Sequence, residues 1–296
     1  LKAHDPDTLK LLANVQGIIC DEVHTLAADT FWAVAMKTTK AYYRVGLSAT
    51  PLKHGSNRGT FVIAALGPVI YTVSAKLLQS LGVLSRPTIK FVTVKQTTTL
   101  PTWQGVYGEN IVRSAKRNRV IIDIVEQAAK PCLVFVKQLN HGVLLHKALL
   151  KAGLSCENIS GKESVPQRTA AVERLIRGDN DVLVVNVIFQ EGVDIPSLAS
   201  VVMANGDASP IAVLQRMGRG MRATKVKSTF EVYDIADRGC GCTPATRRKD
   251  PKNFHKGCQW LDSHTKDRLK ALEEEEYDVE IIDPDSLFSQ GISAGG

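Results

Sequence analysis

The chain has 296 residues, which is room for about two domains, and apolar residues make up 44% of it. No apolar run approaches the roughly 18 residues of a membrane span, and the charged N-terminal segment is unlike a secretory signal, so we expect a soluble cytoplasmic protein. The net charge is +7, but residues 273–296 carry eight acids and no Lys or Arg, which leaves +15 on the other 272 residues. A basic body of this kind suits a polyanion such as DNA or RNA.

Short apolar runs alternate with segments of helical period, which predicts an α/β fold with parallel sheets. Before residue 96 we expect a helix over Leu26–Lys37 and strands over Val15–Cys20, Tyr43–Leu47, Val69–Val73 and Thr88–Val94. The next stretch, residues 96–108, is irregular and contains four threonines, two glycines and Pro101. It predicts a linker between one domain over residues 1–95 and another over residues 109–296.

The same alternation continues after the linker. We expect helices over Glu109–Ala129, Leu139–Lys151, Val165–Arg177, Pro210–Met221 and Cys258–Glu275. We expect strands over Leu133–Val136, Val182–Val185, Ser200–Ala204, Thr229–Asp234 and Asp278–Ile282. Repeats with a period of about 20–50 residues are absent from the sequence, so a repeat architecture is not expected.

Two adjacent carboxylates, Asp21 and Glu22, follow the first predicted strand and precede Val23 and His24. Open α/β sheets bind their ligands at the carboxyl ends of strands. Carboxylates at such a place hold a magnesium ion and polarise a water molecule. The pair therefore predicts a metal and phosphate site in the first domain.

Three arginines lie on the predicted helix Pro210–Met221 and just after it, with glycines around the middle one. Gln215, Arg219 and Arg222 share one helix face because they are four and three residues apart. A guanidinium group binds phosphate through two hydrogen bonds and neutralises charge on a transferred phosphoryl group. This helix predicts a second phosphate-binding element.

Together with Gly46-Leu47-Ser48-Ala49-Thr50-Pro51, these two segments resemble motifs II, III and VI of superfamily 2 helicases and translocases in their DExH-box form. The resemblance covers nearly the whole chain. Residues 67–71 and 117–119 are similar to the branch that contains phage and repair helicases, closest to branch-migration DNA helicases of the bacteriophage T5 type. The resemblance implies two RecA-like domains. Residues 1–95 would be the C-terminal part of the first and contain motifs II and III, and residues 109–296 would be the helicase C-terminal domain.

The resemblance also implies a function and its partners. ATP and Mg²⁺ would bind at the interdomain cleft, and hydrolysis would drive unwinding or branch migration of forked DNA. Such proteins act in DNA replication, recombination and repair, here in the cytoplasm of a host cell if the source is a phage. An obligate protein partner is not implied.

The resemblance assigns roles to single residues. Asp21 holds magnesium, Glu22 contacts it through water and acts as general base, and Arg219 and Arg222 complete the catalytic set. The nucleotide is contacted by these four and by His24, Gly192, Asp194 and Gln215. The nucleic acid is contacted by Ser48, Thr50, Lys137, Gly161, Lys162, Asn186, Arg247 and Arg248. Many family members have Thr where this chain has Asn186, which weakens that last assignment.

A phosphate-binding loop of the form G-x-x-x-x-G-K-[ST] is missing from the sequence. In the family it precedes the acidic motif by many tens of residues, so we expect the first domain to be incomplete at its N-terminus and this chain alone to be inactive. Two alternatives stay open. One is an RNA helicase of the same superfamily, and the other is a nucleic-acid-binding fragment without catalytic activity.

The six cysteines fall into two groups. Cys20, Cys132 and Cys156 lie in or beside apolar segments and are expected to be packed thiols. Cys240, Cys242, His255 and Cys258 could supply four zinc ligands, although their spacing fits no standard zinc pattern. Reduced thiols without a metal are the favoured interpretation for a cytosolic protein, and zinc remains the alternative.

Overall fold

The computed structural model describes residues 5–26, 28–48, 51–52, 58–83, 85–186, 195, 197–207, 229–241, 255–274 and 276–289. The chain divides into two compact units, Leu1–Val73 and Ser74–Gly296, and each is described by itself. Within the described residues, none of the helices is long and apolar enough to cross a membrane. The predicted helix Pro210–Met221 lies outside the described residues.

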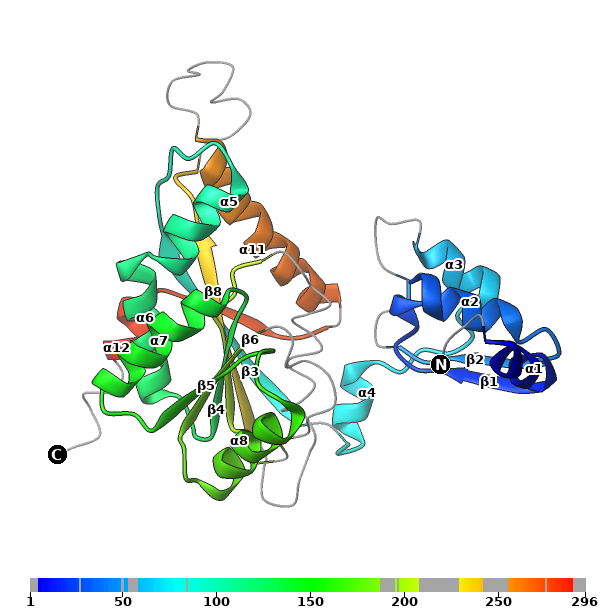
Figure 1. Cartoon of the computed structure of the whole chain (residues 1–296). Coiled ribbons are helices and arrows are strands. Elements are labelled where there is room, and N and C mark those ends of the chain that lie inside the picture. Colours follow the sequence, from blue (N-terminus) through cyan, green and yellow to red (C-terminus); the bar gives the residue numbers. More distant parts are fainter. Residues whose placement is uncertain are drawn as a thin grey trace, which may run out of the picture. The chain divides into compact units, whose positions relative to one another are not determined.

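The first unit contains a small parallel sheet with three α-helices (Figure 1). Its elements in chain order are α1 (Pro6–Asn14), β1 (Gly17–Cys20), a 3-10 turn η1 (Val23–Thr25), α2 (Asp29–Lys37), β2 (Tyr43–Gly46) and α3 (Arg58–Leu66). Strands β1 and β2 pair in parallel from Gly17 opposite Tyr43 to Cys20 opposite Gly46. The carboxyl ends of both strands therefore lie at one edge.

The core of the first unit is small and is reinforced by one arginine. Its buried members come from η1, α2, α3 and the residue after η1, and they are Val23, Leu26, Ala35, Val62 and Ala65. Arg44 of β2 donates hydrogen bonds to backbone carbonyls of Ala35, Thr38, Ala41 and Ala65. Since these carbonyls lie near the ends of α2 and α3, one guanidinium fixes both helices to the strand.

The second unit is built on a seven-stranded parallel sheet with the order β5-β6-β4-β7-β8-β3-β9. The strands are β3 (Arg86–Lys95), β4 (Cys132–Val136), β5 (Cys156–Ile159), β6 (Val182–Asn186), β7 (Ser200–Met203), β8 (Thr229–Arg238) and β9 (Val279–Ile282). The helices among its described residues are α4 (Ala75–Ser80), α5 (Trp103–Val106), the π-helix η2 (Tyr107–Val112), α6 (Ala115–Gln127), α7 (Leu139–Lys151), α8 (Val165–Arg177), α11 (Lys256–Glu274) and α12 (Pro284–Ser289). The predicted α/β class with parallel sheets is confirmed.

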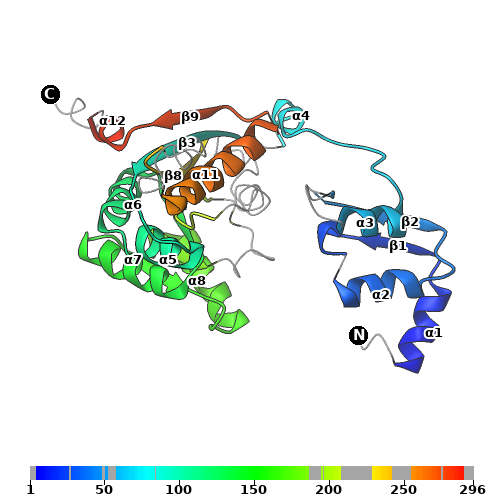
Figure 2. The same ribbon diagram turned by 90° about the horizontal axis from the view of Figure 1, so that it is seen from above.

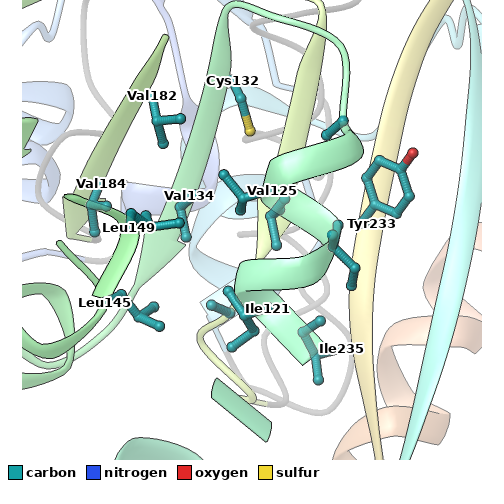
Figure 3. Packing of buried hydrophobic residues seen from close by; sticks show 14 of the residues in the cluster. Ile121, Val125, Cys132, Val134, Leu145, Leu149, Val182, Val184, Tyr233 and Ile235 are labelled. Carbon is teal, nitrogen blue, oxygen red and sulfur yellow. The ribbon is translucent and has the colours of Figure 1, made fainter. Parts of the chain in front are cut away.

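Helices cover both faces of this sheet (Figures 1 and 2). Helices α6 and α7 pack on one face over residues such as Val134, Val184 and Ile235, as Figure 3 shows. Helices α8 and α11 pack on the other face, where Phe135 and Val185 are buried. Every residue of β4 and β6 is buried, which is typical of parallel strands that are covered on both sides.

Three predictions about the elements differ from the structure. Residues 69–73, predicted as a strand, have no regular secondary structure. The single helix predicted over Glu109–Ala129 is two helices, η2 and α6, because Ser114 has an extended backbone and its hydroxyl accepts the Arg117 N–H to cap α6. The strand assigned to the first domain, β3, pairs with β8 and β9 in the second unit, so the domain boundary lies near residue 73 and not at the linker predicted over residues 96–108.

Candidate functional site

The acidic motif lies directly after β1 in a tight turn. One carboxylate oxygen of Asp21 accepts the backbone N–H of Glu22 at 2.9 Å. Glu22 has a left-handed backbone, with φ of 51°, and it begins η1. For a residue other than glycine, such a conformation costs on the order of 1–3 kcal/mol and is concentrated at functional sites. The turn leaves both carboxylates exposed at the edge of the sheet.

The strand exits of β1 and β2 are joined by backbone hydrogen bonds. The N–H of Leu47 donates to the Cys20 carbonyl at 2.8 Å, and the N–H of Val23 donates to the Leu47 carbonyl at 3.1 Å. These bonds continue the sheet past its last paired residues. They bring the acidic motif against the segment that contains Ser48.

Side chains complete this connection between the two motifs. Nδ1 of His24 lies 3.2 Å from the Ser48 hydroxyl oxygen and 3.2 Å from a carboxylate oxygen of Glu22. A single ring nitrogen therefore contacts one group from each motif. Three of the predicted site residues, Glu22, His24 and Ser48, form one contiguous cluster.

The acidic pair fits the requirements of a magnesium ion that also binds phosphates. Magnesium keeps several waters and takes only one or two carboxylates from the protein. Asp21 and Glu22 supply two exposed carboxylates. In the described part of the chain, these carboxylates belong to no group of three or more metal-ligating side chains, so a dedicated protein cage is not built there.

A second group of predicted residues gathers at one edge of the seven-stranded sheet. Val136 of β4 is in register with Asn186 of β6, and Val185 of β6 is in register with Ile159 of β5. The strands are parallel, so the residues that end them or follow them lie at the same edge. Those predicted to contact nucleic acid there are Lys137, Gly161, Lys162 and Asn186.

Local contacts shape the loop after β5. Glu163 accepts hydrogen bonds from the backbone N–H and the hydroxyl of Ser160 at 2.7 and 2.8 Å, and the Lys162 N–H donates to the same hydroxyl oxygen at 3.3 Å. Gly161 and Lys162 are exposed at the tip of this turn. The backbone of Lys162 is therefore held in a hydrogen-bonded turn, and its side chain is open to solvent.

Lys137 and Asn186 have different environments. The ammonium of Lys137 lies 5.7 Å above the centre of the Tyr107 ring and 4.0 Å from a carboxylate oxygen of Asp207. Asn186 is buried, and in the described part of the chain its side-chain oxygen has no hydrogen-bond partner. A buried acceptor without a partner is costly, which marks this position as one that a donor from a ligand would stabilise.

Sequence reasoning missed a network of buried ion pairs behind this edge. Arg117 of α6 is fully buried, and its Nε donates to a carboxylate oxygen of Asp237 of β8 at 2.8 Å. Burial raises the pKa of Asp237, and the Arg117 guanidinium opposes that rise. Arg268 of α11 contacts Asp234 of β8 in the same way at 2.8 Å. Arg117 lies at helical spacing from the apolar residues of α6, and this pattern could have indicated a buried arginine. The sequence alone could not identify Asp237, 120 residues later, as its partner.

The cysteines follow the prediction only in part: Cys20 is half-buried, and Cys240, expected to be a reduced thiol, is disulfide-bonded. Cys132 and Cys156 are buried free thiols, and burial raises their pKa to about 11 and about 12. The ligand atoms of Cys240, His255 and Cys258 lie within 4.8 Å of one another. The described part of the chain therefore brings together three of the four predicted zinc ligands.

The remaining predicted residues cannot be placed from the structure. Those outside the described residues are Thr50, Gly192, Asp194, Gln215, Arg219, Arg222, Cys242, Arg247 and Arg248. The phosphate-binding role of the arginine motif therefore stays a prediction.

Comparisons with known proteins agree with the motifs. Residues 116–224 match the helicase conserved C-terminal domain, and residues 4–53 match the res subunit of type III restriction enzymes. The chain is 25% identical over 252 residues to helicase 22 of a Sulfolobus islandicus filamentous virus, and 23% identical over 266 residues to the ATP-dependent DNA helicase UvsW of Enterobacteria phage T4. These matches support a superfamily 2 helicase.

The matches extend over different shares of this chain and of its relatives. The two viral matches take in 79% and 87% of this chain but 45% and 52% of the relatives, so the chain spans about half of their length. A shorter stretch of 117 residues, 38% of this chain and 20% of the relative, is 37% identical to the pre-mRNA-splicing ATP-dependent RNA helicase PRP28 of Yarrowia lipolytica. Both DNA and RNA helicases are therefore among the relatives.

A solved structure has the same fold as this chain. S. cerevisiae Dbp5 bound to RNA and ADP BeF3 superimposes with a TM-score of 0.58 at 12% identity, covering 95% of this chain and 65% of Dbp5. At this identity the likeness concerns the fold alone. It confirms the predicted RecA-like architecture.

Proposed function

We propose that this protein is a superfamily 2 helicase, an ATP-driven DNA motor of the DExH-box type that unwinds or branch-migrates forked DNA. The observation that supports this most is the cluster of Glu22, His24 and Ser48. The cluster connects the acidic motif to Ser48, just after the end of β2, through one histidine nitrogen. A motor needs such a connection, because the state of the nucleotide has to change the grip on nucleic acid.

The acidic pair is proposed to perform the chemistry. Mg²⁺ held by Asp21 would offset the negative charge of the ATP phosphates. Glu22 then orients the attacking water and accepts its proton, and its contact with Nδ1 of His24 orients the carboxylate. Arg219 and Arg222 are proposed to neutralise the charge that develops on the transferred phosphoryl group.

The edge of the seven-stranded sheet is proposed to hold the nucleic-acid backbone. Lys162 supplies an exposed ammonium group on a fixed turn, and Lys137 supplies a second one from the end of β4. Groups of this kind contact phosphates and carry no sequence information. The basic loop residues Arg247 and Arg248, together with Ser48 and Thr50, are assigned to the same partner.

DNA is preferred over RNA as the partner because the match to the DNA helicase of phage T4 spans 266 residues, whereas the match to the RNA helicase PRP28 spans 117. The second candidate is an RNA helicase. The higher identity to PRP28 over a shorter stretch favours it. The two candidate functions share the same ATP chemistry. They differ only in whether DNA or RNA stimulates ATP hydrolysis.

The test is ATP hydrolysis by the full-length protein with Mg²⁺, measured without nucleic acid, with forked DNA and with an RNA fork of the same sequence. We expect stimulation by the DNA fork and loss of at least about 100-fold in turnover for Glu22→Gln, since a positioned general base contributes about 10²–10⁴. Binding of a fluorescent ATP analogue should persist in that variant. Glu126→Gln, at an exposed glutamate of α6, is the matched control.

Each other outcome has a defined meaning. Stimulation by RNA alone would replace DNA with RNA as the partner. Wild-type turnover in Glu22→Gln would refute the assigned chemistry. Nucleic-acid binding by the full-length protein without any hydrolysis would establish the non-catalytic alternative.

A further inference from the structure

A group of metal-ligating side chains lies far from the acidic motif in sequence, where β8 ends and α11 begins. Cys240 follows β8 by two residues, and His255 and Cys258 lie just before and within the first turn of α11. Their ligand atoms lie within 4.8 Å of one another, and the Cys240 sulfur is 3.4 Å from Nδ1 of His255. The two ends of the segment 241–254 thus meet at this point.

The distance between the Cys240 sulfur and the His255 nitrogen fits a tetrahedral zinc ion. Zinc bonds of about 2.3 Å to sulfur and about 2.0–2.1 Å to nitrogen, at the tetrahedral angle, place sulfur and nitrogen roughly 3.5 Å apart and two sulfurs roughly 3.8 Å apart. The observed sulfur–nitrogen distance is 3.4 Å. A set of thiolates and one imidazole selects zinc over magnesium or calcium, which prefer oxygen ligands.

Glycines allow the close approach that this geometry requires. A Cβ atom on Gly239 would lie 2.4 Å from the carbonyl oxygen and 2.6 Å from the Cβ of Cys258, so only glycine fits there. Gly241 has φ of 78°, a left-handed backbone that other residues rarely adopt. The backbone N–H of Gly239 also donates to a carboxylate oxygen of Asp262 in α11 at 3.1 Å.

The surroundings of the fully buried Cys258 suit a metal-bound sulfur. The backbone N–H of Thr98 points at the sulfur at 3.4 Å, and such donors stabilise a thiolate. The thiol also lies 3.7 Å from the Thr98 carbonyl, a contact that is given up when zinc replaces the thiol proton. The cluster therefore has its own hydrogen-bond support from the segment that follows β3.

We infer that Cys240, His255 and Cys258 form a structural zinc site. The structure records Cys240 as disulfide-bonded, so the zinc-binding form is the reduced one. A dithiol reductant supplies two electrons and two protons to the disulfide and is itself oxidised to a disulfide; zinc then displaces the proton of each coordinating thiol. Cys242, two residues after Cys240, is a fourth thiol available in the sequence.

The site would join the two ends of the segment that contains Arg247 and Arg248, both proposed to contact nucleic acid. It would also fix the end of β8 to the start of α11. A structural zinc ion contributes directly to folding free energy, so its removal should lower thermal stability. This effect does not require nucleotide or nucleic acid.

The test begins with metal analysis of the protein purified with a dithiol reductant and zinc, then freed of excess metal. We expect about one zinc per chain in the wild type and a loss of at least tenfold in Cys240→Ser and His255→Ala. Cys20→Ser, at a half-buried thiol in the other unit, should keep its zinc. Cys240 is exposed, and circular dichroism checks that its variant is folded.

Three further measurements test whether these residues bind zinc or whether Cys240 stays in a disulfide. Cobalt in place of zinc should give the visible bands of a tetrahedral ion with sulfur-to-metal charge transfer, and Cys242→Ser tests whether that thiol is the fourth ligand. A chelator should lower the melting temperature of the wild type and leave that of Cys240→Ser unchanged. Zinc far below one per chain, or a Cys240 disulfide that persists under dithiol reductant, would overturn the inference.

Discussion

The left-handed backbone of Glu22 places its carboxylate where His24 can contact both it and Ser48. The sequence predicted each of these residues separately, from an acidic pair after one strand and a hydroxyl after another. It could not predict that one histidine nitrogen would contact both groups, because that depends on the register of β1 and β2. The contact suggests that His24 transmits a change at Glu22 to the segment after β2.

At this scale we predict that His24→Ala separates hydrolysis from movement. ATP turnover should stay within about threefold of the wild type, whereas DNA unwinding should fall roughly tenfold, since a coupling of about 1.4 kcal/mol corresponds to a factor of ten. Parallel assays of phosphate release and strand separation measure the two effects in the full-length protein.

The partner residue supplies the control. Ser48→Ala should reproduce the loss of unwinding, and the double variant should be no worse than either single variant, because both changes remove one contact. Ser263→Ala, at an exposed serine of α11, should behave like the wild type. Additive losses in the double variant would show that the two residues act independently.

At the scale of elements, α6 is attached to β8 by a buried ion pair. The Arg117 side chain is fully buried and pairs with Asp237, whereas two residues along the same helix Arg119 is 71% exposed and pairs with Asp123. Burying one charge without its partner costs several kcal/mol, but an exposed pair contributes little. The two arginines therefore allow a matched comparison on one helix.

We predict that Arg117→Met destabilises the protein by about 3–5 kcal/mol, because Asp237 is left as a buried charge. Arg119→Met should change stability by no more than about 0.5 kcal/mol. Urea unfolding followed by circular dichroism measures both. Restored stability in Arg117→Met combined with Asp237→Leu would confirm the cause, and equal effects of the two single variants would contradict it.

The elements that the sequence predicted well are those specified by local signals. Helices α7 and α8 match their predicted bounds, and α8 has a capping box at Ser164 and a left-handed Gly178 at its end. The location of β3 was wrong because its partners, β8 and β9, lie far away in the sequence. Strand patterns identify a strand but not its neighbours, so the domain boundary was misplaced.

At the scale of the whole molecule, charge should dominate the interaction with nucleic acid. We predict that affinity for forked DNA falls by about 10³-fold or more between 50 and 200 mM salt, since roughly six phosphate contacts produce such a slope. Lys162→Ala should reduce the slope of log affinity against log salt concentration by about one, because one phosphate contact is lost. Lys147→Ala, at an exposed lysine within α7, is the control and should leave the slope unchanged. Fluorescence anisotropy at several salt concentrations measures this.

A strong dependence of affinity on base sequence would contradict this prediction, because phosphate contacts do not distinguish bases. An unchanged slope in Lys162→Ala would remove the loop after β5 from the proposed interface.

The position of β3 in the sheet has a consequence for how the protein is made. This strand leaves the ribosome early but lies between β8 and β9, which are synthesised about 140 and 190 residues later. Contacts over such distances form slowly, and an unpaired strand edge is prone to associate with other chains. Strands β4 to β7 can pair with one another before the partners of β3 have been synthesised. The sheet can therefore be completed only after the last part of the chain has been synthesised. If translation stopped before residue 229, the released chain would contain β3 with both of its edges unpaired.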